Sequence, residues 1–284
     1  MRRKYVPGGK HGFWMTVFVY IMLFAGLVMF LFPVYWMIST SLKHPPDIYS
    51  FPPKWFHFAI RWQNYVDIFT LVDFQHYLKN TVVYTVSVIV GTVLSSSMVA
   101  FGFARLRARG SKALFAIMLA TMMLPFQVTM IPQYLLFNQL GWANSYLPLI
   151  VPSFTGSAFA IFLLRQFFMG IPKELDEAVK IDGGSYWTMY CRMILPLSVP
   201  SLATIAILEF MGRWNDLMGP LIYIDSQSKF PVSLGLANFT AAFGQTPWHL
   251  LMAASTVAIT PPLLVFFFAQ KYFIRGIVIS GSKG

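Results

Sequence analysis

The chain has 284 residues, of which 57% are hydrophobic and 11% are charged, and its mean hydropathy is +0.62. Water-soluble domains usually carry about 25% charged residues, so this composition excludes an ordinary soluble domain and predicts an integral membrane protein. The single cysteine, Cys191, excludes an intrachain disulfide and a cysteine-rich metal site. The formal net charge of +11 is expected to reflect how the loops are sorted across the bilayer.

Several apolar segments are long enough to cross a membrane, since a spanning helix needs about 20 mostly apolar residues. Six spans are predicted: 13–38, 80–104, two within 113–164, about 199–224 and about 249–270. Small residues such as Gly91 and Ser96 indicate that the second span faces protein more than lipid. We predict an all-α fold, with a six-helix transmembrane domain over 13–270, an N-terminal tail of 1–12 and a C-terminal tail of 271–284.

Most of the 21 Lys and Arg residues lie on one side of the predicted spans: before the first, between the second and third, between the fourth and fifth, and after the sixth. The positive-inside rule then places both termini in the cytoplasm of a protein of the plasma or inner membrane. Because these residues are divided among separate loops and tails, no single basic stripe is available to bind nucleic acid.

The sequence contains no pattern typical of a catalytic, nucleotide or metal site. It has no Gly-x-x-x-x-Gly-Lys-Ser/Thr phosphate loop, and its five His residues show no ligand spacing. We therefore expect no catalytic residue, bound cofactor or metal in this chain.

The loop 171–197, between the fourth and fifth predicted spans, carries the strongest local signals. Pro172 suits the first position of a helix, the acidic residues that follow favour the positive end of its dipole, and Gly183 provides a stop. Ser185 can cap a second helix. Four apolar residues recur about one turn apart and predict a single apolar stripe: Leu175, Ala178, Val179 and Ile181. An amphipathic loop lying on the membrane surface would share these features.

This loop resembles the EAA signature of permease subunits in binding-protein-dependent ABC importers. The residues that align with this signature and its neighbours are Glu177, Ala178, Val179, Asp182, Gly183, Leu195 and Pro196. Val179 stands where the signature has a second Ala, and Met193 stands where it has Ile, so both departures remain apolar. The loop is most similar to that of the carbohydrate-uptake family, the relatives of the maltose permease. Trp36, Pro125, and the run Trp214-Asn215-Asp216 also look like this family.

The resemblance implies an ABC importer type I (MetI-like) transmembrane domain that transports solute and is not an enzyme. It implies three kinds of partner: a second permease subunit as a heterodimer, two ATPase subunits or an ATPase dimer, and an extracytoplasmic sugar-binding protein. ATP and Mg²⁺ would be bound by the ATPase, and the EAA residues would couple this chain to it. The outer segments, about 39–79 and 225–248, would face the binding protein.

Three charged residues in the fifth predicted span are costly in a bilayer, so they should face a cavity or each other. Glu209, Arg213 and Asp216 are spaced i, i+4 and i+7 and are predicted to share one helical face. They could form a self-neutralised ion pair or line a translocation pathway, where Trp214 and Asn215 could contact a sugar. Among maltose-type relatives, the partner permease provides the principal sugar contacts.

The leading hypothesis is half of the translocation pathway for a sugar or oligosaccharide delivered by a binding protein. A first alternative is the same architecture importing a polyol or a glycerophosphodiester. A second alternative is a secondary transporter that uses Glu209, Arg213 and Asp216 and works without an ATPase.

Overall fold

The computed structural model describes residues 10–55, 60–239 and 246–281, with side chains described in 13–55, 60–239 and 246–270. Every regular element within these ranges is a helix, which confirms the predicted all-α class. The N-terminal tail predicted over 1–12 falls mostly outside the described residues. The chain divides into two compact units: Met1–Val72 with Phe239–Val257, and Asp73–Asn238 with Ala258–Gly284.

The first unit consists of α1 (Lys10–Ser41), α2 (Pro45–Ile48), α3 (Gln63–Leu71) and the beginning of α16 (Trp248–Gly281). The buried Asn64 of α3 fixes the chain that leaves α1, because its amide donates to the carbonyl oxygens of Ser41 at 2.8 Å and Lys43 at 2.9 Å. The Lys43 ammonium lies 4.2 Å from the centre of the Trp36 ring. Burial lowers the pKa of Lys43, and the Asp47 carboxylate opposes this shift.

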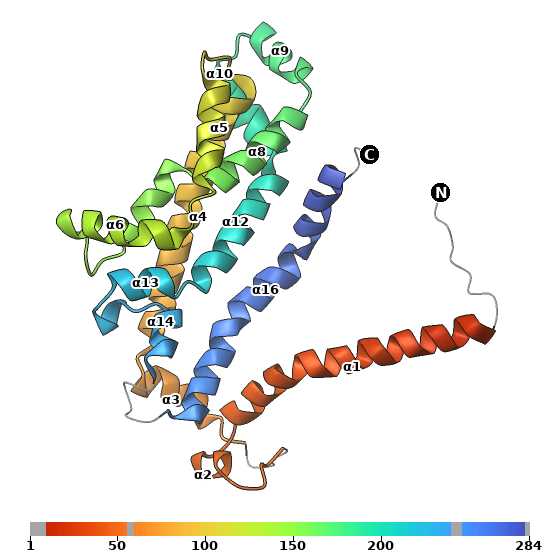
Figure 1. The fold of residues 1–284 in the computed structure, drawn as a ribbon, viewed down its shortest axis with the longest axis vertical. Coiled ribbons are helices and arrows are strands. Elements are labelled where there is room, and N and C mark those ends of the chain that lie inside the picture. The colour runs from red at the N-terminus through yellow and green to blue at the C-terminus, as the bar shows by residue number, and fades with distance from the viewer. Residues whose placement is uncertain (1–9, 56–59, 240–245, 282–284) are drawn as a thin grey trace. The chain divides into compact units, whose positions relative to one another are not determined.

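The second unit is built around the long helix α4 (Phe74–Arg105), which packs mainly against α8 (Ala158–Gly170) and α12 (Val199–Trp214). The remaining elements of this unit are α5 (Ser111–Thr121), α6 (Phe126–Gln139), α7 (Leu147–Ile150), the 3₁₀ helix η1 (Val151–Thr155), α9 (Glu174–Ile181), α10 (Tyr186–Met189), the π-helical turn η2 (Tyr190–Ile194), α11 (Leu195–Leu197), α13 (Met218–Tyr223), η3 (Gln227–Lys229), α14 (Val232–Ala237) and the rest of α16. Within this unit, α9 and α10 lie at one end, and α13 and α14 lie toward the other (Figure 1).

Small side chains on α4 allow the close packing that the sequence predicts for the second span. Ser95 Oγ donates to the carbonyl oxygen of Ser153 at 3.0 Å, and Ser96 Oγ accepts from the Ser157 amide at 3.0 Å. The most apolar window of α4 is 39% buried within the chain, whereas that of α1 is 0% buried. Among the four long apolar helices that the structure describes, α4 is thus the most buried, which agrees with the predicted role of its small residues.

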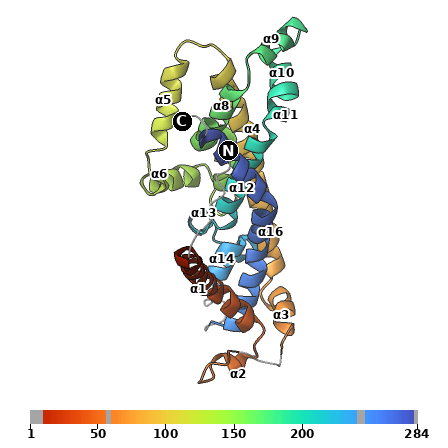
Figure 2. The same cartoon turned by 90° about the vertical axis from the view of Figure 1, so that its right-hand side faces the viewer.

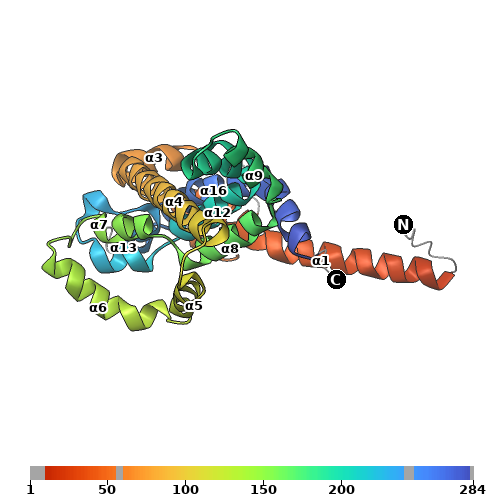
Figure 3. The ribbon, with the colours of Figure 1, turned by 90° about the horizontal axis from the view of Figure 1, so that it is seen from above.

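Four described helices are long and apolar enough to cross a membrane, and two bent helix pairs raise the number to as many as six. The third predicted span is one of these pairs, since α5 and α6 meet at 96° (Figure 2). Pro125 lies at the break, and proline disfavours helical geometry in the residue before it. In Figure 3, α5 and α6 form an arc rather than a single rod.

The fifth predicted span, about 199–224, consists of two helices. α12 ends at Trp214, and α13 begins at Met218 after a short turn. The Asp216 carboxylate stabilises this turn by accepting a hydrogen bond from the Gly219 amide at 3.0 Å. The sixth predicted span agrees with the apolar stretch Trp248–Gln270, although the helix α16 itself continues to Gly281 and so includes part of the predicted C-terminal tail.

The close approach of α4 to η1 predicts an effect on stability at Gly91. A Cβ atom there would lie 2.9 Å from the Phe154 ring and closer still to Ser153 Oγ, whereas a Cβ at Gly102 of the same helix would meet no atom within 4 Å. Gly91→Ala should therefore destabilise the protein by about 1–3 kcal/mol relative to Gly102→Ala, which shares the gain in helix propensity. Thermal unfolding in detergent measures this difference, and equal melting temperatures for the two variants would contradict it.

Candidate coupling segment and membrane cavity

The loop 171–197 forms α9, α10, η2 and α11. Lys173 is the N-cap of α9, and its carbonyl oxygen accepts from the amides of Asp176 and Glu177. Pro172 therefore precedes the helix, and its predicted place at the first helical position is wrong. The acidic first turn, with Glu174, Asp176 and Glu177, complements the positive end of the helix dipole as predicted.

Gly183 ends α9 through a two-bond helix stop. Its own amide donates to the Lys180 carbonyl at 3.0 Å, and the Gly184 amide donates to the Val179 carbonyl at 2.8 Å, which is the Schellman pattern. Gly183 has φ = +75°, in the left-handed region that favours glycine. The prediction that Gly183 provides the helix stop is confirmed.

α9 presents most of its surface to the outside of the chain. Glu177, Ala178 and Asp182 are exposed, and Ile181 is 85% exposed. Val179 instead packs against the core of the second unit. The predicted single stripe is wrong in this respect, because Val179 and Ile181 are only two residues apart and therefore face nearly opposite sides of the helix.

The segment after α9 returns the chain toward α12. Ser185 Oγ accepts from the Thr188 amide at 3.1 Å, which confirms Ser185 as a helix cap. The Leu195 amide then donates to the Tyr190 carbonyl, which closes a π-helical turn. Leu195 is half-buried against the core, whereas Pro196 is exposed.

One buried residue connects α9 to the body of the second unit. Arg105, the last residue of α4, has a side chain that is only 2% exposed. Its Nη2 donates to the carbonyl oxygen of Ile171 at 2.8 Å, and its Nη1 lies 3.4 Å from Asp176 Oδ2. In the sequence, Arg105 counts only as one basic residue of a loop, so its contact with Asp176 could not be foreseen.

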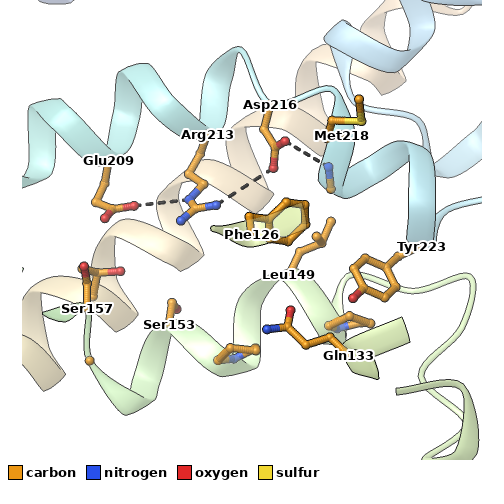
Figure 4. Close-up of a pocket in the computed structure, with 15 residues that line it drawn as sticks. Phe126, Gln133, Leu149, Ser153, Ser157, Glu209, Arg213, Asp216, Met218 and Tyr223 are labelled. Atoms are coloured by element: carbon orange, nitrogen blue, oxygen red, sulfur yellow. Dashed lines mark hydrogen bonds and ion pairs between the residues drawn. The ribbon is translucent and has the colours of Figure 1, made fainter. Parts of the chain in front are cut away.

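A cavity of about 370 Å³ lies farther along the second unit, between α4, α6, α7, η1, α12 and α13. Glu209, Arg213 and Asp216 point into it from one side, and Ser153 and Ser157 face them from the other (Figure 4). Its remaining lining residues are Thr92, Phe126, Gln133, Pro148, Leu149, Pro152, Gly156, Met218, Gly219 and Tyr223.

The three charged residues form two ion pairs, both through Arg213. Arg213 Nε lies 3.2 Å from Glu209 Oε2, and Arg213 Nη1 lies 4.0 Å from Asp216 Oδ2. Asp216 stands just beyond the end of α12, so the prediction of one shared helical face holds only for Glu209 and Arg213. Two carboxylates surround one guanidinium, which gives the group a formal charge of −1 when all three are ionised.

Trp214 and Asn215 do not line this cavity. Trp214 is buried, and its Nε1 donates to the Ala258 carbonyl at 3.0 Å. Asn215 is exposed, and its amide donates to the Met211 carbonyl at 2.8 Å. Their predicted contact with a sugar stays a prediction without support from this cavity.

Tyr84 is a further residue of the charged cluster that the sequence analysis missed. It is fully buried on α4, and its hydroxyl donates to Asp216 Oδ2 at 2.7 Å. A tyrosine in an apolar helix is a weak signal, because its partner lies far away in the sequence.

These features define a class: a multi-pass membrane protein with a polar cavity between its helices and an exposed amphipathic helix at one end. Residues 91–279 match the family described as binding-protein-dependent transport system inner membrane component, and the chain belongs to this family. It is therefore a transport component and not an enzyme.

Relatives match over nearly their whole length. The chain is 32% identical to the arabinooligosaccharides transport system permease protein AraQ of Halalkalibacterium halodurans, over 87% of this chain and 86% of the relative. It is 31% identical to the sn-glycerol-3-phosphate transport system permease protein UgpE of Pectobacterium atrosepticum, over 94% of this chain and 97% of the relative.

Two solved structures share the fold. A chain of a bacterial ABC transporter involved in the import of the acidic polysaccharide alginate superposes with a TM-score of 0.83 at 22% identity, over 93% of this chain and 98% of that chain. A chain from a bacterial alginate ABC transporter in complex with an alginate pentasaccharide-bound periplasmic protein gives a TM-score of 0.62 at 18% identity, over 89% and 92%.

The hydrogen bond from Tyr84 to Asp216 predicts a measurable contribution to stability. Tyr84→Phe would leave the Asp216 carboxylate without one of its donors, which should cost about 1–3 kcal/mol. Tyr134→Phe is the matched control, because Tyr134 lies on α6 and is 39% exposed. Thermal unfolding of both variants in detergent tests this, and equal stability of Tyr84→Phe and Tyr134→Phe would refute the contribution.

Proposed function

We propose that this chain is one permease subunit of an ATP-driven importer and forms half of a translocation pathway for a sugar or oligosaccharide. The observation that carries this proposal is α9, a short helix that is stopped by Gly183 and exposes Glu177 and Ala178. A small residue allows close seating against a partner, and a carboxylate can pair with a basic or amide group. α9 is the part of the chain that an ATPase would contact.

The second subunit, the ATPase and the binding protein are proposed partners. Family membership supports a binding protein, as does the likeness of this fold to a transporter chain solved with a periplasmic protein. In this arrangement α9 and both termini face the cytoplasm, where the ATPase binds ATP and Mg²⁺. A second permease of similar fold would complete the pathway as a heterodimer.

Glu209, Arg213 and Asp216 are proposed to line the pathway, and their charges favour an uncharged carbohydrate over a glycerophosphodiester. Among the described residues that line the cavity, the one guanidinium lies between two carboxylates. A phosphate would therefore meet net negative charge, whereas sugar hydroxyls could bond to Gln133 and to the serine hydroxyls. The relative named for arabinooligosaccharides supports a carbohydrate, and the relative named for sn-glycerol 3-phosphate keeps the phosphate-bearing solute as the alternative.

Purification from native membranes tests the importer against a secondary transporter. The chain should copurify with an ATPase and a second permease, and vesicles containing the complex and its binding protein should take up a neutral oligosaccharide only with ATP. Arabinotriose and sn-glycerol 3-phosphate are the probes to compare. Uptake by the isolated chain driven by a proton or sodium gradient would refute the proposal, and uptake of sn-glycerol 3-phosphate alone would overturn the choice of solute.

Substitution of Gly183 tests whether α9 is the coupling helix, because this residue has a left-handed conformation that most side chains disfavour. Gly183→Val would force a β-branched residue into this conformation, at a cost of about 1–2 kcal/mol, and should misplace the end of the helix. We expect normal membrane insertion and continued ATP hydrolysis, but about tenfold less uptake per ATP. Glu177→Lys should have the same effect through lost pairing.

Gly183→Asn is the matched control, because Asn tolerates the left-handed conformation better than a β-branched residue. Its uptake per ATP should stay near that of the wild type. Full transport by Gly183→Val would argue against α9 as the coupling helix.

A further inference from the structure

The contact between Arg105 and Asp176 joins three segments through one side chain. Arg105 ends α4, Ile171 follows the last residue of α8, and Asp176 lies in the first turn of α9. The guanidinium donates to the Ile171 carbonyl at 2.8 Å and lies 3.4 Å from the Asp176 carboxylate. One buried group therefore contacts both ends of the connection between α8 and α9.

The environment of this pair makes it sensitive to the loss of either partner. The side chains of Arg105 and Asp176 are 2% and 14% exposed. Arg105 Nε, Arg105 Nη1 and Asp176 Oδ1 are buried without a hydrogen-bond partner in the part of the chain that the structure describes. Little else in the described structure compensates for these two charges, so each depends on the other.

Arg105 differs from the neighbouring arginines in its burial. Arg107 and Arg109 follow in the same loop, and both are exposed. Arg105 alone of the three has a buried guanidinium aimed at α9. A general preference for basic residues on one side of the membrane accounts for all three residues but not for this burial.

α4 connects the Arg105 contact to the cavity. The same helix carries Thr92, which lines the cavity, and Tyr84, which donates to Asp216. A single helix thus contacts α9 through its last residue and the charged cluster through its middle. Rigid helices of this kind can transmit displacement between distant sites.

We propose that Arg105 is a positioning residue for transport, which fastens α9 to α4 so that displacement of α9 by the ATPase reaches the cavity. This inference rests on the proposed function. Arginine is suited to the role, because its planar group contacts a carbonyl and a carboxylate at fixed positions, which a lysine ammonium cannot reproduce.

The test uses the complete importer in vesicles, with ATP hydrolysis and uptake measured together for the neutral oligosaccharide that the wild type imports. The variants are Arg105→Met, Asp176→Asn, their combination, Arg105→Lys, and Arg107→Met as the matched control. The deciding quantity is solute imported per ATP hydrolysed, since a merely structural role would lower both rates in proportion and leave this ratio unchanged.

Arg105→Met should lower the ratio about tenfold, and Asp176→Asn should lower it in the same direction. The double variant should be no worse than Arg105→Met, because both changes break one contact. Arg105→Lys should restore part of the ratio, and Arg107→Met should leave it unchanged.

A wild-type ratio in Arg105→Met overturns the inference, as do proportional losses of both rates. If Arg105→Met fails to assemble, Asp176→Asn tests the same contact with nearly unchanged shape, and an unchanged ratio there overturns it too. Absence of ATP-dependent uptake by the wild type would refute the proposed function instead, so the two failures are distinguishable.

Discussion

Charge buried in a hydrophobic chain must be paired, and this constraint organises the second unit. Arg213 lies between Glu209 and Asp216, and Arg105 lies against Asp176 and a carbonyl oxygen. Neither the bilayer around α12 nor the protein interior around Arg105 hydrates such groups fully, so their partners must come from the protein itself. The Arg105 pair joins the end of α4 to the first turn of α9, whereas the Arg213 cluster links the last turns of α12 to Asp216, just beyond the end of this helix.

The two charged groups have different consequences because their exposure differs. The Arg213 side chain is 40% exposed toward a cavity, so its cluster provides a polar wall that a solute can contact. The Arg105 side chain is almost completely enclosed, so its pair can act only by holding protein segments together. Both groups contain an arginine and a carboxylate, so it is their exposure that makes one able to contact a solute and the other able only to hold helices together.

The long helix α4 contacts most of the functional elements of the second unit. Its small residues allow α8 and η1 to approach, its middle supplies Tyr84 to the cavity, and its last residue holds α9. Of the two bent helix pairs, one contributes α12, which packs against α4, and the other contributes α5, which packs against α8. Proline and polar residues near these breaks interrupt helices that hydropathy alone would draw as straight rods.

The sequence by itself determined the membrane class, the approximate position of the spans, the stop of α9 at Gly183 and the family. All of these features depend on local composition, backbone preference and residue spacing, which can be read directly from the sequence. Only the tertiary structure decided that α12 ends before Asp216, that Val179 faces inward while Ile181 faces outward, and that Arg105 reaches Asp176. The physical reason is that burial and ion pairing depend on residues far apart in sequence, whose meeting the folded helices alone determine.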